Sequence, residues 1–342
     1  MNHFIDRLEI TNFKSIRQLT VDGFGRINLF IGRPNVGKSN IIEALSLLNT
    51  SWEKLTDIVR VENLRELHFN GDINQEVSIK IRRDKNLQYE EVCKLIFLKS
   101  ASETLVAARS INTFDPNDVH TNQKYAYTVN DNFSVHKPKG YSQIFEPETK
   151  RYAYRPDVKF LERRVSYLLP PFGENILYVL ELMPELRKLY AQWFRQYGLR
   201  LVLDTASQSL KVQKEKGEDE VFQLPYSSVA DTLQRIIFYK TAVASNENSV
   251  LLFEEPEAHA YPPYISEFTQ EVIRSLTNQF FIVTHSPLIV EEFLTDAIDE
   301  LGIFMVDFKD GQTVVRGLTT EEVYEVRKYG VDLFFNSEAY LS

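Results

Sequence analysis

Short, wholly apolar runs separated by helix-like segments are the clearest pattern in this chain of 342 residues. Apolar runs of this length, bounded by turn residues, are typical of buried parallel strands, and periodic segments between them are typical of crossover helices. The apolar runs are 27–31, 250–253 and 280–283, and helix-like segments follow the first and the second of them. The pattern predicts an α/β fold built on a parallel sheet.

Other parts of the chain show the alternation of half-buried strands or the spacing of helices. We expect a strand pair in 4–21, paired strands at 77–81 and 95–98, strands near 199–203 and 210–212, helices at 40–48, 174–198 (interrupted at Pro184) and 231–244, and a hairpin of 304–308 and 312–315 around Asp310-Gly311. Residues 100–165 are polar, aromatic and weakly periodic. They predict an insertion of irregular structure.

A loop of the form G-x-x-x-x-G-K-[ST] joins the first apolar run to its helix. Its glycines let successive N–H groups point at phosphate oxygens, and the helix that follows adds its positive dipole end. Lys38 supplies a charge for the outer phosphates and Ser39 a hydroxyl for Mg²⁺. The residues expected to bind nucleotide here are Gly32, Arg33, Pro34, Asn35, Val36, Gly37, Lys38, Ser39 and Asn40.

Two carboxylates and a histidine follow the later apolar runs. Glu254 and Glu255 end the 250–253 strand, which we expect to lie beside the strand of the phosphate loop. Glu254 would then reach the Mg²⁺ shell, and Glu255, pointing to the other side, would polarise a water for attack on the outer phosphate. His285 follows the 280–283 run, where ligands bind in parallel sheets, and could contact the outer phosphate or orient the water. The alternatives are a solvated acidic turn and a structural histidine.

Composition limits the classes of protein that remain. One cysteine, Cys93, excludes an internal disulfide and fits a reducing cytoplasm. The first residues do not have the pattern of a signal peptide, and no apolar stretch is long enough to span a membrane. The net charge of -9 argues against indiscriminate coating of DNA. We therefore expect a cytoplasmic protein with no membrane segment.

A local basic and aromatic stretch lies within this acidic chain. Residues 137–164 contain eight basic and four acidic residues with interleaved tyrosine and phenylalanine. The stretch is either a solvated insertion whose aromatic residues pack on their own small core, or a surface for DNA or a partner protein. Sequence alone leaves both interpretations open.

Four segments carry a resemblance to a known family. They are 8–16, an opening strand; 32–40, the Walker A loop; 253–259, a Walker B strand with its following D-loop; and 284–287, a switch-histidine loop. In this order they resemble the ABC-type ATPase heads of the SMC, RecF and OLD-like group, and within it the compact AAA15/AAA21-like AAA-family ATPases.

The resemblance implies a division of the chain as well as a fold. It implies a P-loop NTPase of ABC-type ATPase head architecture, with mixed parallel and antiparallel sheets and an α+β insertion lobe. The N-terminal half of the head, with Walker A, is expected at 1–99 and the insertion or docking lobe at 100–222. The C-terminal half, with a signature-like helix, Walker B and the switch histidine, is expected at 223–342. No sustained heptads fill the insertion, so a chromosome-bridging rod is not expected.

The resemblance also implies a homodimer that sandwiches ATP and Mg²⁺ between its subunits. The signature segment that would cover the partner's outer phosphate is expected within 226–235, which lacks the usual glycine. Ser227 and Ser228, or the turn that contains Asp231, could take its place, and the register stays open. Gln75, before the 77–81 strand, is the candidate for the metal-side glutamine loop, although a polar surface loop explains it equally well.

The function implied is an ATP-hydrolysing switch or scaffold for a partner effector in bacterial anti-phage defence or DNA repair. A nuclease or toxin involved in such a module is expected to be a separate chain. The alternative is a nucleotide-gated scaffold with little hydrolysis that sequesters the effector. A GTPase or a small-molecule kinase is disfavoured, because the chain lacks an Asn-Lys-x-Asp guanine-reading motif.

Overall fold

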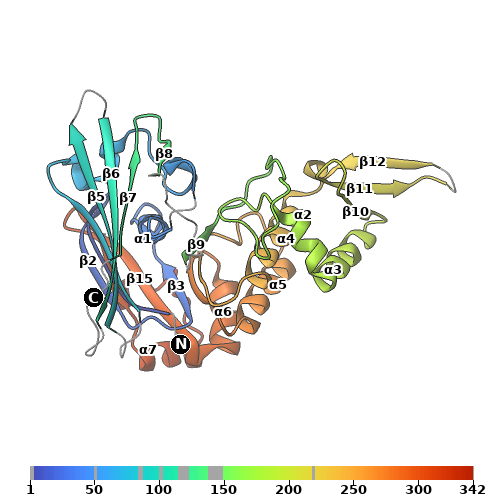
Figure 1. The fold of residues 1–342 in the computed structure, drawn as a ribbon. Helices are drawn as coiled ribbons and strands as arrows, with labels where there is room; N and C mark the ends of the chain where they lie inside the picture. The colour runs from blue at the N-terminus through green and yellow to red at the C-terminus, as the bar shows by residue number, and fades with distance from the viewer. Residues whose placement is uncertain are drawn as a thin grey trace. The chain divides into compact units, whose positions relative to one another are not determined.

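The computed structural model describes residues 4–49, 52–83, 88–99, 103–114, 123–137, 149–217 and 220–341, which form two compact units (Figure 1). Unit 1 contains Met1–Arg151, Asn248–Glu255 and Thr277–Ser342, and unit 2 contains Tyr152–Glu247 and Pro256–Leu276. The phosphate loop, both strand-end acids and His285 therefore all belong to unit 1. No helix in the described ranges has the length and apolar character needed to cross a membrane.

A largely parallel sheet in unit 1 carries the predicted apolar strands. Its order is β16-β15-β3-β14-β13-β9, with β3 paired in parallel to both β14 and β15, and β13 paired in parallel to β14. The strands are β3 (Ile27–Ile31), β9 (Thr149–Tyr152), β13 (Val250–Glu254), β14 (Gln279–Val283), β15 (Leu301–Lys309) and β16 (Gln312–Gly317). The parallel sheet and the β15–β16 hairpin, whose two-residue turn has positive φ at Asp310 and Gly311, are confirmed.

One expectation about this sheet is wrong. The strand that ends in Glu254 does not lie beside the strand of the phosphate loop, because β14 lies between β13 and β3. Residues 250–253 of β13 and 280–283 of β14 are all apolar, so hydrophobicity could not decide the order of the two strands. The functional consequence survives, since the carboxyl ends of β3, β14 and β13 still meet at one edge of the sheet.

An antiparallel sheet forms the other layer of unit 1, in the order β2-β1-β4-β5-β6-β7-β8. Its strands are β1 (Ile5–Phe13), β2 (Ile16–Asp22), β4 (Val77–Arg83), β5 (Gln88–Lys99), β6 (Glu103–Phe114), β7 (Gln123–Val129) and β8 (Val135–His136). The predicted pairs of β1 with β2 and of β4 with β5 are confirmed.

The expectation of irregular structure throughout 100–165 is wrong, because β6, β7, β8 and β9 lie there. Strands β5 and β6 pair along their whole length, from Gln88 with Phe114 to Lys99 with Glu103. The antiparallel sheet thus continues through the boundary expected after residue 99, and the 100–222 segment is divided between the two units. Hydrogen bonds to neighbouring strands form this part of the sheet, and the weak periodicity of its residues does not reveal them.

Helix α1 (Lys38–Ser46) lies between the two sheets of unit 1 (Figure 1). It contacts β1 on one side and β13 and β14 on the other. Its apolar residues are fully buried on all sides, as a helix enclosed by two layers requires. The helix that carries the phosphate loop is therefore rigidly held. Helices α6 (Pro287–Asp296) and α7 (Thr320–Tyr329) also belong to unit 1 and contact each other.

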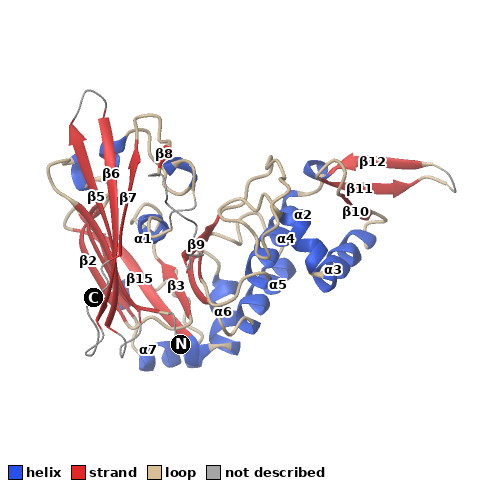
Figure 2. Ribbon diagram, in the orientation of Figure 1, coloured by secondary structure: helices blue, strands red, loops and turns tan. Residues whose placement is uncertain are grey.

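Unit 2 is mainly helical and carries a small separate antiparallel sheet (Figure 2). Its elements are α2 (Ile176–Leu182), α3 (Pro184–Arg195), β10 (Arg200–Asp204), β11 (Ser209–Glu215), β12 (Val221–Pro225), α4 (Asp231–Ala244) and α5 (Pro262–Arg274). Pro184 begins α3, which confirms the predicted interruption. Helices α4 and α5 pack together, and the buried Lys240 ammonium lies 3.1 Å from Glu267 Oε2 and 2.6 Å from Glu271 Oε2.

Candidate nucleotide site

The phosphate loop has the backbone shape that its two glycines allow. Gly37 has a φ of +94°, and Asn35 also lies in the left-handed region, with a φ of +63°. A Cβ on Gly32 would lie 2.1 Å from the Val306 carbonyl oxygen, and one on Gly37 would lie 2.0 Å from Thr313 Oγ1. Both positions therefore exclude a side chain for steric reasons, in addition to the approach of phosphate.

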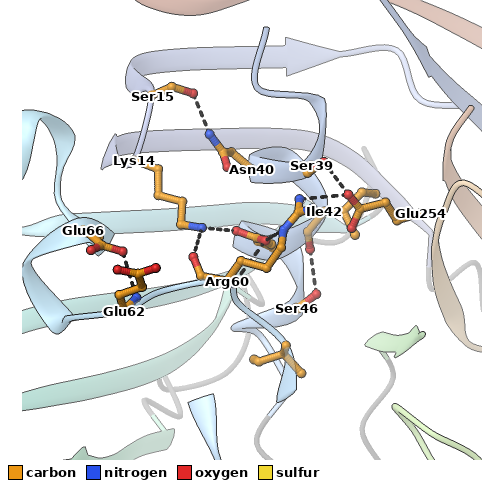
Figure 3. A network of polar contacts seen from close by, with 12 residues as sticks. Lys14, Ser15, Ser39, Asn40, Ile42, Ser46, Arg60, Glu62, Glu66 and Glu254 are labelled. Carbon is orange, nitrogen blue, oxygen red and sulfur yellow. Dashed lines mark hydrogen bonds and ion pairs between the residues drawn. The ribbon is translucent and has the colours of Figure 1, made fainter. Parts of the chain in front are cut away.

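A chain of hydroxyl and amide groups braces the loop from outside. Thr313, at the start of β16, donates its hydroxyl to the Val36 carbonyl at 2.8 Å. The Thr313 and Ser15 hydroxyls lie 2.6 Å apart, and Asn40 Nδ2 donates to Ser15 Oγ at 2.6 Å (Figure 3). The β1–β2 turn and β16 thus hold the loop near its end, at Val36 and at Asn40 in the first turn of α1. Sequence reasoning missed Thr313, which has no motif and lies far along the chain.

Lys38 curls over the loop that carries it. Its ammonium donates to the Gly32 carbonyl at 2.8 Å and the Arg33 carbonyl at 2.7 Å. Burial lowers the pKa of Lys38 to about 8, against the opposing effect of the nearby Glu255 and Glu254 carboxylates. The charge that would meet the outer phosphates is thus held in a partly desolvated position, where electrostatic interactions are strong.

The two residues predicted to hold Mg²⁺ are in direct contact. Ser39, in the first turn of α1, donates its hydroxyl to Glu254 Oε1 at the end of β13 (Figure 3). A hydroxyl and a carboxylate are the hard oxygen ligands that Mg²⁺ prefers, so this pair fits the ion. Within the described ranges, no group of three or more His, Cys, Asp or Glu residues could hold a metal. The fit is therefore to an ion that takes the rest of its shell from phosphates and water.

Two arginines complete the surroundings of the Glu254 carboxylate. Arg60 Nη2 donates to Oε1 at 2.9 Å, and Arg151 Nη2 donates to Oε2 at 2.8 Å. We call Ser39, Arg60 and Arg151 together the Glu254 clamp. Sequence reasoning missed both arginines: Arg60 lies in a loop without a motif, and Arg151 lies in the basic stretch that was considered as a surface.

A buried carboxylate supports the clamp from α1. The Glu43 side chain is fully buried, and it accepts hydrogen bonds from Arg60 Nε at 3.0 Å and from the Lys14 ammonium. Lys14 also donates to the Arg60 carbonyl at 2.7 Å. A buried carboxylate needs such partners to offset its desolvation, so Glu43 ties the Arg60 loop and the β1–β2 turn to α1.

Glu255 and His285 face each other at the same edge of the sheet. His285 Nε2 lies 3.6 Å from Glu255 Oε1, which is longer than a hydrogen bond. The Glu255 N–H donates to the Val283 carbonyl at 2.8 Å, and its φ of +45° turns the chain away from β13. Burial and the Lys38 charge lower the pKa of His285, while Glu255 opposes the shift. The lowered pKa favours the neutral imidazole, the form that can orient a water molecule.

The loop that carries His285 is fixed on both sides. The Ser286 N–H donates to Thr284 Oγ1 at 3.0 Å, and the Ser286 hydroxyl caps α6 by accepting from the Ile289 N–H. Ser and Thr are favoured at such positions because they satisfy the N–H groups that a helix start leaves unpaired. The sequence Thr-His-Ser-Pro therefore positions the histidine as well as supplying it.

The candidate signature residues lie in unit 2. Ser227 and Ser228 are exposed in a short 3₁₀ turn, and Asp231 begins α4. The Thr232 hydroxyl donates to the His259 carbonyl at 2.7 Å, so the start of α4 is joined to the segment after the strand-end acids. These assignments stay predictions. So does that of Gln75, whose amide donates to Asp72 Oδ2 at 2.9 Å in the turn before β4.

The structure reduces the number of basic residues in 137–164 that are available to a DNA or protein partner. Lys150 and Arg151 are buried in unit 1, and Tyr152 is buried in unit 2, where its hydroxyl donates to the Leu168 carbonyl. Exposed basic residues of the stretch are Lys137, Arg155, Lys159, Arg163 and Arg164. Residues 138–148 lie outside the described ranges. A surface for DNA or a partner would therefore have fewer charges than the sequence count gives.

These features define a class of protein before any comparison. A Walker A loop, strand-end acids and a switch histidine meet at one edge of a parallel sheet, and an antiparallel sheet packs on the other side of α1. That is the architecture of an ABC-type ATPase head, a P-loop NTPase fold.

Comparison with known proteins finds two AAA family matches. The family described as "AAA ATPase domain" matches residues 4–162, and the family described as "AAA domain, putative AbiEii toxin, Type IV TA system" matches residues 186–291. The chain thus matches AAA ATPase families over most of its length, in agreement with the resemblance that the four motifs gave. It is an enzyme that hydrolyses ATP.

Three relatives illustrate how far the similarity extends. An "ATP/GTP phosphatase" of Helicobacter pylori is 20% identical over 84% of this chain and 86% of its own length. The head of an SMC protein bound to the C-terminal winged-helix domain of ScpA covers 94% of this chain and 99% of that one, with 17% identity and a TM-score of 0.53. An Smc head from Pyrococcus furiosus, bound to the C-terminal domain of ScpA, covers 95% and 99% with 14% identity and a TM-score of 0.54. At such identities the solved structures share the fold alone.

Proposed function

We propose that this ATPase is a nucleotide-driven switch, in which ATP closes two copies of the chain around shared nucleotide and hydrolysis opens them again. The observation that carries the proposal is the meeting of two carboxylates with different surroundings beside Lys38. Glu254 is held by Ser39 and two arginines, whereas Glu255 faces His285 and solvent. Such a pair can divide metal binding from water activation.

Each residue has one role in the proposed reaction. The loop N–H groups and Lys38 bind the phosphates, while Ser39 and Glu254 would hold Mg²⁺, which neutralises phosphate charge when bound. The Glu255 side chain is 48% exposed and has no arginine among its ion-pair partners in the described residues, so it is free to accept a proton from water. Neutral His285 orients that water or donates to the outer phosphate.

Closure of a dimer would complete the site. The side chains of Glu255 and His285 are 48% and 36% exposed, so a surface of the site is available to a second copy. The start of α4, with Ser227, Ser228 and Asp231, is the segment proposed to cover the partner's outer phosphate. Its N–H groups and hydroxyls suit an anion without the usual glycine.

Glu255→Gln separates chemistry from binding. We expect turnover to fall by about 100-fold or more, because the base is lost, while ATP binding remains and dimer accumulates in sedimentation with ATP. Glu325→Gln, an exposed glutamate on α7, is the matched control and keeps normal turnover. Hydrolysis by Glu255→Gln at the parent rate would show that the assigned base is wrong.

A nucleotide-gated scaffold with little hydrolysis is the alternative, and the missing signature glycine favours it. Sedimentation of the parent with ATP and with a non-hydrolysable analogue distinguishes the two functions. The switch gives a dimer that decays with ATP and persists with the analogue. The scaffold gives the same assembly with both and releases no phosphate.

We further propose that the switch acts in the cytoplasm on a separate effector, a nuclease or toxin, in a defence or repair module. Two facts support an effector: one matching family is described with a toxin–antitoxin system, and the SMC heads of similar fold are bound to ScpA. Co-expression with genes next to this one, followed by purification with and without ATP, tests it.

DNA binding through the exposed part of 137–164 is tested by titration at two salt concentrations, since phosphate contacts weaken steeply with salt.

A further inference from the structure

The two arginines of the Glu254 clamp are held in very different ways. The Arg151 side chain is 9% exposed, and its second terminal nitrogen, Nη1, donates to the Ile58 carbonyl. The Arg60 side chain is 65% exposed and reaches Glu254 only with Nη2. Arg151 is therefore fixed to the protein at both ends of its guanidinium, while the end of Arg60 that touches Glu254 is accessible to solvent.

Arg60 also occupies the side of Glu254 where the metal is expected. Ser39 and Arg60 both donate to Oε1, whereas Arg151 donates to Oε2. An ion bound by Ser39 and Glu254 would lie against Oε1 and so against the Arg60 guanidinium. Two positive groups beside the same carboxylate oxygen repel each other, so the ion and the Arg60 guanidinium would compete for this position.

We propose that Arg60 is a displaceable counter-ion of Glu254 and that Mg²⁺ binding with nucleotide exchanges it, whereas Arg151 is the permanent counter-ion that positions the carboxylate. The proposal rests on the assignment of Ser39 and Glu254 as metal ligands in the proposed function. In the nucleotide-free protein, Arg60 then adds positive charge beside the Glu254 and Glu43 carboxylates.

Glu43 determines how far Arg60 can move. The Glu43 carboxylate accepts from both the backbone N–H of Arg60, at 3.2 Å, and its Nε, at 3.0 Å. Lys14 holds the Arg60 carbonyl. The backbone and the inner nitrogen are thus fixed to α1, and only the outer end of the guanidinium has to leave Glu254.

Displacement of Arg60 by Mg²⁺ makes a prediction about how strongly Mg²⁺ raises nucleotide affinity. A simple contact between Arg60 and phosphate does not make this prediction. The probe is a ribose-labelled fluorescent ATP analogue, and the quantity is the ratio of its Kd in EDTA to its Kd in MgCl₂. An arginine that only contacts phosphate changes both constants by the same factor. If Arg60 competes with the metal, Arg60→Gln raises the ratio at least threefold, because Mg²⁺ no longer has to displace it.

Matched variants make the result decisive. Arg274→Gln removes an arginine of the same 65% exposure on α5 and leaves the ratio unchanged. Arg60→Lys keeps the charge without the planar fork and gives an intermediate ratio. Thermal melting in EDTA verifies that each variant folds, as expected for an exposed side chain. An Arg60→Gln ratio equal to or below that of the parent overturns the proposal.

A separate variant tests the underlying assignment. Glu254→Gln abolishes the dependence of nucleotide binding on Mg²⁺ if Glu254 is a metal-side ligand. Normal Mg²⁺ dependence in that variant would refute the metal assignment itself, whatever Arg60→Gln does. Loss of dependence in Glu254→Gln together with an unchanged ratio in Arg60→Gln would refute only the exchange.

Discussion

At the scale of single residues, neighbouring side chains of the same chemistry have different surroundings. Glu254 ends β13, is 16% exposed and accepts from three donors, whereas Glu255 turns away with a positive φ towards His285. Glu254 is thus surrounded by cations, whereas Glu255 faces solvent and the His285 imidazole. These surroundings support the proposed division between metal binding by Glu254 and water activation by Glu255.

Lys38 makes nucleotide binding depend on pH. Its pKa of about 8 in the free protein means that the ammonium loses its proton as pH rises through 8, whereas bound phosphate favours the charged form. We expect affinity for the fluorescent ATP analogue to be constant between pH 6.5 and 7.5 and to fall by up to about tenfold per unit above pH 8. Lys38→Met binds more weakly and lacks this fall. Constant affinity of the parent to pH 9.5 would contradict the lowered pKa.

His285 gives turnover a lower pH limit. Its pKa lies below the ordinary value, so the neutral form persists into mildly acidic solution and is lost only as pH falls further. We expect kcat to decline on the acid side, and His285→Gln to reduce kcat by roughly 10- to 1,000-fold with little change in nucleotide affinity. Steady-state phosphate release at several pH values measures both. If kcat of His285→Gln declines at low pH in the same way as that of the parent, the decline belongs to another group.

At the scale of elements, the phosphate loop is shaped by strands that are distant in sequence. Gly37 needs the space beside Thr313, and the hydroxyl of Thr313 holds the Val36 carbonyl. The β15–β16 hairpin therefore acts on the nucleotide site without touching nucleotide. The turn at Asp310-Gly311 sets the register that places Thr313 there.

Thr313→Val tests this support. The valine keeps the shape and leaves the buried Val36 carbonyl without its hydroxyl partner, so we expect the free energy of unfolding to fall by about 1–2 kcal/mol. Nucleotide affinity should weaken several-fold, because the loop is less well fixed. Thr313→Ser, which keeps the hydroxyl, is the control. Denaturant unfolding and nucleotide titration measure the effects, and equal values for all three proteins would exclude a role for the brace.

At the scale of the whole molecule, the predicted nucleotide contacts are divided between two units. Unit 1 contains Lys38, Glu254, Glu255 and His285, while the candidate signature turn and α4 belong to unit 2. In the proposed dimer, a nucleotide bound by unit 1 of one copy meets unit 2 of the other. ADP with Mg²⁺ would then stabilise unit 1 alone, whereas ATP in the closed dimer would stabilise both units.

Hydrogen exchange can distinguish these conditions. With ADP and Mg²⁺ we expect slower exchange in the phosphate loop and α1 alone. With ATP and Glu255→Gln, which holds the closed state, we expect slower exchange also in 226–235, by an amount that grows with protein concentration. The control is α3, whose exchange should not change. Unaltered exchange in 226–235 with ATP at high protein concentration would contradict the assigned signature segment.

The local pattern of the sequence determined the elements and much of the chemistry. The phosphate loop, the strand-end acids and His285 were predicted because each lies at the end of a strand whose apolar run is local. The parallel strands, α1 and the Asp310-Gly311 hairpin follow from the same spacing of apolar and turn residues. Carboxyl ends of parallel strands meet at one edge, so these predictions also brought the residues together.

Only the tertiary structure decided the order of the strands and the partners of Glu254. The apolar runs 250–253 and 280–283 look alike in the sequence, so their pattern does not show that β14 lies between β3 and β13. The weakly periodic β6 and β7 became strands through pairing with neighbours. Arg60, Arg151 and Thr313 carry no motif, because their roles arise from contacts with residues about 100 to 300 positions away. Such contacts depend on long-range packing, which local periodicity does not encode.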